Sequence, residues 1–131
     1  MALEFQIITG SSTPVYRQIV DQVRKAVASG ALSAGEQLPS VRALAEHLVI
    51  NPNTVARAYG DLAREGVVES QPGKGLFIAE RRQVFSDDER RRRLDQAVET
   101  FLNDVVLLDF SQAEILSLLK QRLSELFKAR K

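Results

Sequence analysis

The sequence contains no cysteine and only a single histidine, His47. Without cysteine, disulfide bridges, thiolate metal sites and cysteine nucleophiles are excluded. No apolar run approaches the roughly 20 residues that a membrane-spanning helix needs, and residues 1–5 lack the basic-then-apolar layout of a secretory signal. We therefore expect a soluble protein of the reducing cytoplasm that does not enter a membrane.

Groups for catalysis are also scarce. His47 has no cysteine beside it with which to share a metal ion, and no pairing of a nucleophile with a general base is recognisable elsewhere in the chain. The sequence therefore predicts no enzyme activity, no metal site and no cofactor.

A surplus of positive charge is missing as well. The net charge is +1, with seven basic and eight acidic residues in 1–80 and eleven basic and nine acidic residues in 81–131. A nucleic-acid-binding function therefore cannot be inferred from bulk charge. It has to rest on where individual basic residues lie.

The apolar residues of the first half have the spacing of three helices. Thr13 and Pro14 predict the cap and the first residue of a helix that stops at Gly30. A turn-rich connector over 30–39 follows, in which Leu32 and Leu38 can still anchor in a core. Ser40 then predicts the cap of a short second helix.

Asn51 and Pro52 predict the start of a third helix, which Gly66 ends. After Gly66 the pattern changes to two short strand-like runs, 67–70 and 76–79, around the glycine-containing segment 71–75. Two short helices joined by a tight turn form a helix-turn-helix, and the added hairpin makes it a winged helix. The fold is therefore expected to be mostly α-helical with a small β-wing.

Two more helices are predicted in residues 81–131, because Ser86–Glu89 and Ser111–Glu114 both have the spacing of a capping box. Two amphipathic helices cannot bury both apolar stripes against each other alone, which favours a second copy of the chain as partner. The alternative is that they pack back on the winged helix. The residues expected at the dimer interface are Leu94, Val98, Phe101, Leu102, Val105, Ile115, Leu119, Leu123 and Leu126.

The outward face of the third helix is the candidate DNA reader, because recognition helices present their N-terminal residues to base edges in the major groove. Asn53 and Thr54 offer short hydrogen-bonding side chains there, and Arg57 follows one turn later. Alternatively, Asn53 and Thr54 are simply good first-turn residues and Arg57 is solvated. Arg42, in the second helix, either contacts a phosphate or pairs with Glu46 on the surface.

Lys74 lies between Gly73 and Gly75 at the tip of the hairpin. A long cation flanked by glycines can enter a narrow minor groove without a backbone clash, although it can also be a solvated turn residue. The run Arg90–Arg93 is different. Four consecutive helical positions point all the way round a helix, and acidic residues flank them, which favours a solvated, salt-bridged surface.

Taken together, residues 14–79 resemble the GntR family of bacterial regulators. The resemblance is carried by Leu-Pro-Ser-Val-Arg-Ala-Leu-Ala at 38–45, Asn-Pro-Asn-Thr-Val-Ala-Arg-Ala-Tyr at 51–59, Leu-Ala-Arg-Glu-Gly at 62–66 and Gly-Lys-Gly-Leu-Phe-Ile at 73–78. The start of the third helix is similar to that of the YtrA-like subfamily. Several relatives carry a base-reading arginine where this chain has Ala56, and Arg57 is a candidate to replace it.

The resemblance implies a sequence-specific DNA-binding regulator, a repressor of its own operon and of neighbouring transporter genes, associated with the nucleoid. The DNA contacts expected from the pattern and the resemblance together are Ser40, Arg42, Asn51, Asn53, Thr54, Arg57, Gly73, Lys74 and Gly75.

Residues 81–131 are too few for the large effector domain of most relatives. We therefore expect a DNA-binding domain over 1–80 and a two-helix dimerisation segment over 81–131, the only place left for a small-molecule effector. The other hypothesis is a winged-helix protein-interaction module without DNA binding, favoured by the −1 charge of residues 1–80.

Overall fold

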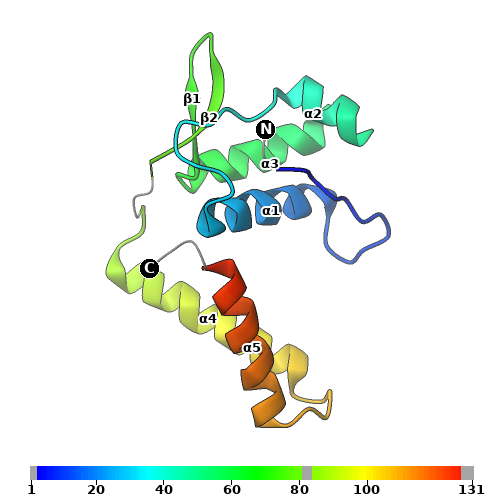
Figure 1. Ribbon diagram of the computed structural model, residues 1–131, viewed down its shortest axis with the longest axis vertical. Helices are drawn as coiled ribbons and strands as arrows, with labels where there is room; N and C mark the ends of the chain where they lie inside the picture. Colours follow the sequence, from blue (N-terminus) through cyan, green and yellow to red (C-terminus); the bar gives the residue numbers. More distant parts are fainter. Residues whose placement is uncertain (1–2, 81–83, 128–131) are drawn as a thin grey trace. The chain divides into compact units, whose positions relative to one another are not determined.

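The computed structural model describes residues 3–80 and 84–127, and the chain divides into two compact units, one of residues 1–82 with 126–131 and one of residues 83–125. The first unit contains helices α1 (Val15–Ser29), α2 (Val41–Leu48) and α3 (Pro52–Arg64), followed by strands β1 (Val68–Gln71) and β2 (Gly75–Ile78). The second contains helices α4 (Asp87–Val105) and α5 (Gln112–Leu126). The expected winged helix followed by two helices is confirmed (Figure 1).

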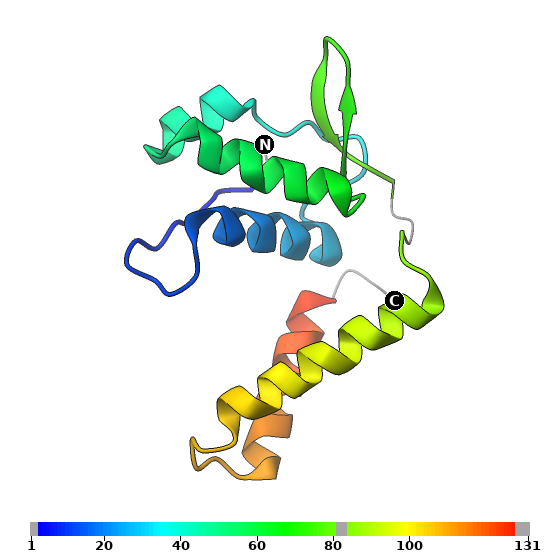
Figure 2. The ribbon, with the colours of Figure 1, turned by 180° about the vertical axis from the view of Figure 1, so that it is seen from behind.

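The core of the first unit forms where α3 packs against both α1 and α2 (Figure 2). Val55, Ala58, Tyr59 and Leu62 of α3 are buried, and the connector residues Leu32 and Leu38, predicted to anchor in the core, are each 2% exposed. The core consists of Phe5, Ile19, Val20, Val23, Ala26, Leu32, Leu38, Leu44, Ala45, Val55, Ala58, Tyr59, Leu62, Val68 and Ile78.

The helix starts follow the capping residues with one exception. Ser40 and Asn51 cap α2 and α3 as predicted. The expectation that Thr13 caps the first helix is wrong, because Pro14 itself occupies the cap position and no side chain caps the helix. The Thr13 carbonyl instead accepts a hydrogen bond of 2.9 Å from the side-chain amide of Gln18, one turn into α1.

The wing is a two-stranded antiparallel hairpin that projects beyond the helices of the first unit (Figure 1). The connector before α2 pairs with β2, the second strand of the hairpin. The sequence pattern did not predict this pairing. The Leu38 N–H donates to the Leu76 carbonyl at 2.9 Å, and the Ile78 N–H donates to the Glu36 carbonyl at 2.8 Å. Because these bonds join the connector to β2, the wing is tied to the base of α2.

The second unit lacks a core of its own among the described residues: neither α4 nor α5 contains a buried side chain. Both helices are capped by serine, Ser86 and Ser111. The predicted capping box is complete at Ser111 and Glu114, whereas Glu89 forms ion pairs with Arg92 and Arg93. The salt-bridged surface expected for the Arg90–Arg93 run is confirmed, with Arg90 paired to Asp87 at 3.1 Å.

Candidate nucleic-acid interface

The N-termini of α2 and α3 place the first candidate residues. The Ser40 hydroxyl accepts a hydrogen bond of 3.0 Å from the Ala43 N–H, and the Asn51 side-chain oxygen accepts one of 2.8 Å from the Asn53 N–H. Each capping side chain can also donate a hydrogen bond outward, from the serine hydroxyl or from the asparagine amide nitrogen. Capping and contact with a phosphate or a base edge are therefore compatible at Ser40 and Asn51.

All nine residues predicted to bind DNA lie in the first unit, and they are accessible. Thr54 is half-buried at the start of α3, and the other eight are exposed. They come from the starts of α2 and α3, from the body of each helix and from the tip of the hairpin. These are the elements that contact DNA in a winged helix-turn-helix.

Of the seven basic residues in 1–80, two form ion pairs with carboxylates among the described residues. Arg24 pairs with Glu65 at 2.6 Å, and Arg64 pairs with Asp61. By contrast, Arg42, Arg57 and Lys74 form no ion pair within residues 3–80 and 84–127, so the alternative pairing of Arg42 with Glu46 is absent there. The cations of the candidate interface are therefore not neutralised by neighbouring carboxylates.

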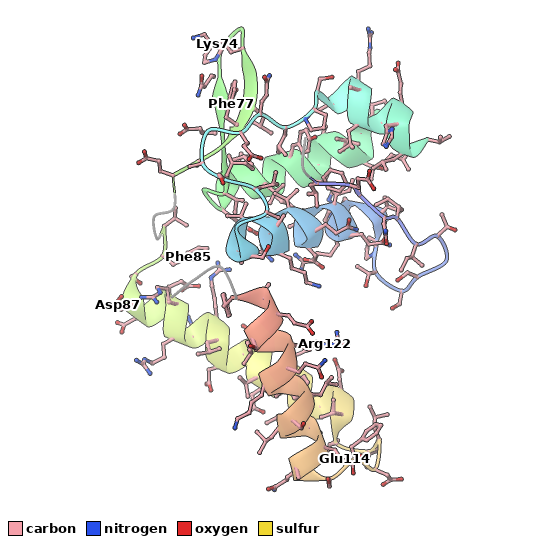
Figure 3. The ribbon with its side chains drawn as sticks, viewed as in Figure 1. Lys74, Phe77, Phe85, Asp87, Glu114 and Arg122 are labelled. Atoms are coloured by element: carbon pink, nitrogen blue, oxygen red, sulfur yellow. The ribbon has the colours of Figure 1, made fainter. Side chains whose placement is uncertain are left out.

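An open groove of about 500 Å³ brings the start of α2, one face of α3 and the wing together. Ser40, Lys74 and Gly75 line it, so residues far apart in the chain border one depression. The α3 side of the groove is formed by Ala56, Tyr59, Gly60 and Ala63. Figure 3 shows Lys74 at the tip of the hairpin, where its side chain is exposed.

Arg57 lies at a different place on α3 from Ala56. The guanidinium carbon of Arg57 lies 3.8 Å from the centroid of the Tyr16 ring on α1, a cation–π contact. Ala56 lines the groove beside the wing, whereas Arg57 is absent from that lining. Ala56 and Arg57 therefore have different surroundings, and Arg57 presents its charge beside the start of α1.

Sequence reasoning missed three residues that shape this surface. Tyr16, predicted only as an apolar helix position, is half-buried and supports Arg57. Gln37 donates a hydrogen bond of 2.7 Å to the Lys74 carbonyl. The buried Tyr59 donates one of 2.8 Å to the Pro39 carbonyl just before α2, and burial raises the pKa of its hydroxyl well above the ordinary value. Each contact joins segments remote in the chain, so no local pattern indicates it.

The apolar residues predicted for dimerisation fall into two sets. Leu94, Val98, Leu102 and Leu123 are between 43% and 66% exposed, whereas Phe101, Val105, Ile115, Leu119 and Leu126 are half-buried. Within the second unit, a groove of about 480 Å³ is lined by apolar residues of α4 and α5 together with Glu114 and Arg122 (Figure 3). The apolar stripe expected from the sequence is therefore largely open.

The described ranges 3–80 and 84–127 contain neither a candidate metal site nor a candidate membrane span. No group of three His, Asp or Glu side chains there is placed to hold a metal ion. None of the helices there is long and apolar enough to cross a membrane.

Comparison with known proteins gives consistent matches. The family model of bacterial regulatory proteins, gntR family, matches residues 15–78. The HTH-type transcriptional repressor YtrA of Bacillus subtilis strain 168 is 47% identical to this chain over 75 residues. These residues are 57% of this chain and 58% of YtrA, so the match spans little more than half the length of that repressor. The uncharacterized HTH-type transcriptional regulator YhcF of the same organism is 38% identical over 111 residues, 84% of this chain and 90% of that one.

Among solved structures, a transcriptional antiterminator from Listeria monocytogenes EGD-e superposes with a TM-score of 0.86 at 31% identity. The superposition covers 97% of this chain and 95% of the other. The likeness therefore extends through both units, whereas the family model covers the winged helix.

Proposed function

The chain belongs to the gntR family of bacterial regulatory proteins, and we propose that it represses transcription as a homodimer on a pseudo-palindromic operator. That it is a DNA-binding transcriptional regulator follows from its family. The proposal adds which residues bind DNA, that the protein is a dimer and that it acts as a repressor. It also places the protein in the cytoplasm, on the DNA of the nucleoid. Repression is supported by the similarity to YtrA, which is a transcriptional repressor.

The observation that carries the binding site is the position of three cations that form no ion pair among the described residues, on α2, on α3 and at the tip of the wing; Arg17 and Lys25 also form none there, but both lie on α1. Arg24 and Arg64 are held by carboxylates, whereas Arg42, Arg57 and Lys74 have no ion-pair partner among the described residues. Arg42 on α2 contacts the DNA backbone, the α3 start at Asn53 and Thr54 meets base edges, and Lys74 enters the minor groove.

A gel shift with the promoter DNA of the chain's own gene tests this site. Arg42→Ala is expected to weaken binding and to reduce the salt dependence by about one phosphate contact. Arg24→Ala is the matched control, because it also removes one arginine from the surface of the first unit but from an existing ion pair. Equal effects of the two substitutions, or no shift by the unaltered protein at low salt, would contradict the proposal. The latter result would favour a protein-interaction module.

The second unit supports the homodimer. Its helices have no buried side chain, and an apolar stripe of α4 through Leu94, Val98 and Leu102 is exposed. Burying apolar surface contributes roughly 25 cal/mol per Å², so a second copy that covers this stripe stabilises both chains. We assign dimerisation to this unit and DNA binding to the first, which is the division expected at residues 80 and 81.

A small-molecule effector, if one acts on this regulator, binds in the groove lined by Phe101, Ile115 and Arg122. The volume of this groove, about 480 Å³, lies in the usual range of ligand pockets. Arg122→Ala is then expected to abolish the response to the effector and to leave operator binding unchanged.

A further inference from the structure

We propose that Gln37, in the connector before α2, is a positioning residue for the wing: its side-chain amide holds the Lys74 carbonyl and thereby sets the direction of the Lys74 side chain toward DNA. The proposal rests on the DNA contact proposed for Lys74. Gln37 itself is not required to touch the nucleic acid.

The backbone of Lys74 is fixed on both sides. Its N–H donates to the Gln71 carbonyl at 2.9 Å, which closes the turn at the hairpin tip. Its carbonyl accepts from the Gln37 Nε2 at 2.7 Å, a bond from outside the hairpin. A two-stranded hairpin is marginally stable by itself, so this second bond restrains the segment that carries the lysine.

The same Gln37 amide also lies against Gly75. A Cβ added at Gly75 would lie 2.6 Å from the Gln37 Nε2, closer than real side chains approach. The φ of Gly75 is +123°, a backbone conformation that favours glycine. Glycine at this position therefore serves two purposes: it permits the turn, and it leaves room for the glutamine amide to reach the Lys74 carbonyl.

The connector keeps Gln37 in place. Backbone hydrogen bonds join Leu38 to Leu76 at 2.9 Å and Glu36 to Ile78 at 2.8 Å, one on each side of Gln37. Gln37 also pairs with Phe77 in an antiparallel bridge. Because the connector leads directly into α2, the bond from Gln37 couples the wing tip to the helix that carries Arg42.

The test begins without DNA, because Lys74 is a trypsin site and the carbonyl that Gln37 holds belongs to the bond that trypsin cuts. Gln37→Met keeps the length of the side chain and removes the donor. Limited tryptic cleavage of the full-length protein between Lys74 and Gly75, followed by mass spectrometry, is expected to be several-fold faster in this variant. Gln22→Met is the matched control, since it also removes an amide–backbone contact, to Gln6, but away from the wing. An unchanged cleavage rate in Gln37→Met would overturn the proposal.

The second arm measures affinity for the promoter fragment over a range of salt concentrations. Gln37→Met is expected to weaken binding roughly threefold to tenfold and to lower the salt slope toward that of Lys74→Ala. In the Lys74→Ala background the same substitution is expected to have little effect, because no side chain remains to be positioned. A Gln37 effect that persists undiminished in this background, or that lowers the melting temperature without changing the slope, would contradict positioning.

The two arms separate failure of this inference from failure of the proposed function. Faster cleavage in Gln37→Met, together with no DNA binding by the unaltered protein, would refute the DNA contact of the wing and hence its positioning for DNA. Unchanged cleavage, together with normal DNA binding, would refute the role of Gln37 and leave the proposed function standing.

Discussion

Val49 ends α2 in a left-handed backbone conformation, with φ 56° and ψ 53°. This conformation brings the Cβ of an L-residue close to the next carbonyl, and β-branched side chains adopt it rarely. Val49 is 88% exposed, so its side chain gains little burial in return. The turn of the helix-turn-helix therefore carries strain at a single residue.

Val49→Gly is expected to stabilise the protein by about 1 kcal/mol, because glycine has no Cβ to strain and is the usual residue at such a helix end. Glycine's greater freedom in the unfolded chain offsets part of the gain. Urea unfolding followed by circular dichroism measures the change. A destabilised variant would show that the Val49 side chain contributes packing that the structure does not indicate.

Tyr59 links the recognition helix to the start of α2 through its hydrogen bond to the Pro39 carbonyl. Burial raises the pKa of its hydroxyl, because the phenolate would lose its hydration. The folded state thus keeps the proton at a pH at which the unfolded chain, with an ordinary tyrosine pKa of 10.0, releases it. The associated stability is fully present below pH 10 and is lost as the pH rises above it.

Tyr59→Phe is therefore expected to cost about 1 kcal/mol at pH 8, since the Pro39 carbonyl loses its partner. Above pH 10 the deficit is expected to shrink by up to about 1.4 kcal/mol per pH unit. Urea unfolding of both proteins at pH 8 and pH 10.5 measures the difference. A deficit that stays constant between these pH values would mean that the Tyr59 hydroxyl titrates alike in the folded and unfolded states.

At the scale of elements, α3 contains a glycine in its interior. Gly60 has helical neighbours on both sides and, unlike the glycines of the turns, no positive φ. A Cβ at this position would meet only the Arg64 Nη1, at 3.5 Å, an ordinary contact. The helix therefore bears the entropic cost of glycine without a packing reason within the chain.

Gly60→Ala is expected to raise the free energy of unfolding by about 0.5–1 kcal/mol, because alanine has the higher helix propensity. Thermal unfolding provides the measurement, and Ala63→Gly, one turn later on the same exposed face, is the reverse control with the opposite sign. A lower melting temperature for Gly60→Ala would contradict the open space that the structure places there.

The elements of the first unit could be predicted from local signals. Ser40 and Asn51 mark helix starts because their side chains satisfy otherwise unpaired N–H groups, and Gly30 adopts the left-handed conformation that ends α1. The pairing of Gln37 with Phe77 is a contact between segments with no shared periodicity. The support of Arg57 by Tyr16 likewise depends on how α1 crosses α3. Such contacts follow from tertiary packing, which one sequence does not specify.

At the scale of the whole molecule, neither helix of the second unit contains a buried side chain. Val98 and Leu102 lie at the centre of the exposed stripe of α4, at 43% and 48% exposure. Because a carboxylate is costly to bury without a partner, Val98→Asp is expected to shift the protein from dimer to monomer. Sedimentation equilibrium measures this shift.

Gln96→Asp is the matched control for the dimer, because it introduces the same carboxylate on the opposite face of α4, where the side chain is also exposed. This variant is expected to remain dimeric. Dissociation by both substitutions, or a monomeric unaltered protein at micromolar concentration, would contradict the assignment of the apolar stripe to a dimer interface.

The apolar stripe itself could be predicted from helical spacing, whereas its openness could not. Spacing places Phe101 and Leu102 on the same stripe, yet Phe101 is half-buried and Leu102 is exposed. Periodicity identifies which residues avoid water but not which neighbour covers each of them. For the same reason, the groove that contains Glu114 and Arg122 had no sequence signal.

The central claim is that two copies of the winged helix occupy two half-sites of one operator. Hydroxyl-radical footprinting of the promoter of the chain's own gene tests it most directly. Two protected half-sites are expected, with their centres one or more whole helical turns apart, about 34 Å per turn, and protection of both is expected to weaken together in Val98→Asp. Protection of a single half-site by the unaltered protein, or no protection at low salt, would contradict it.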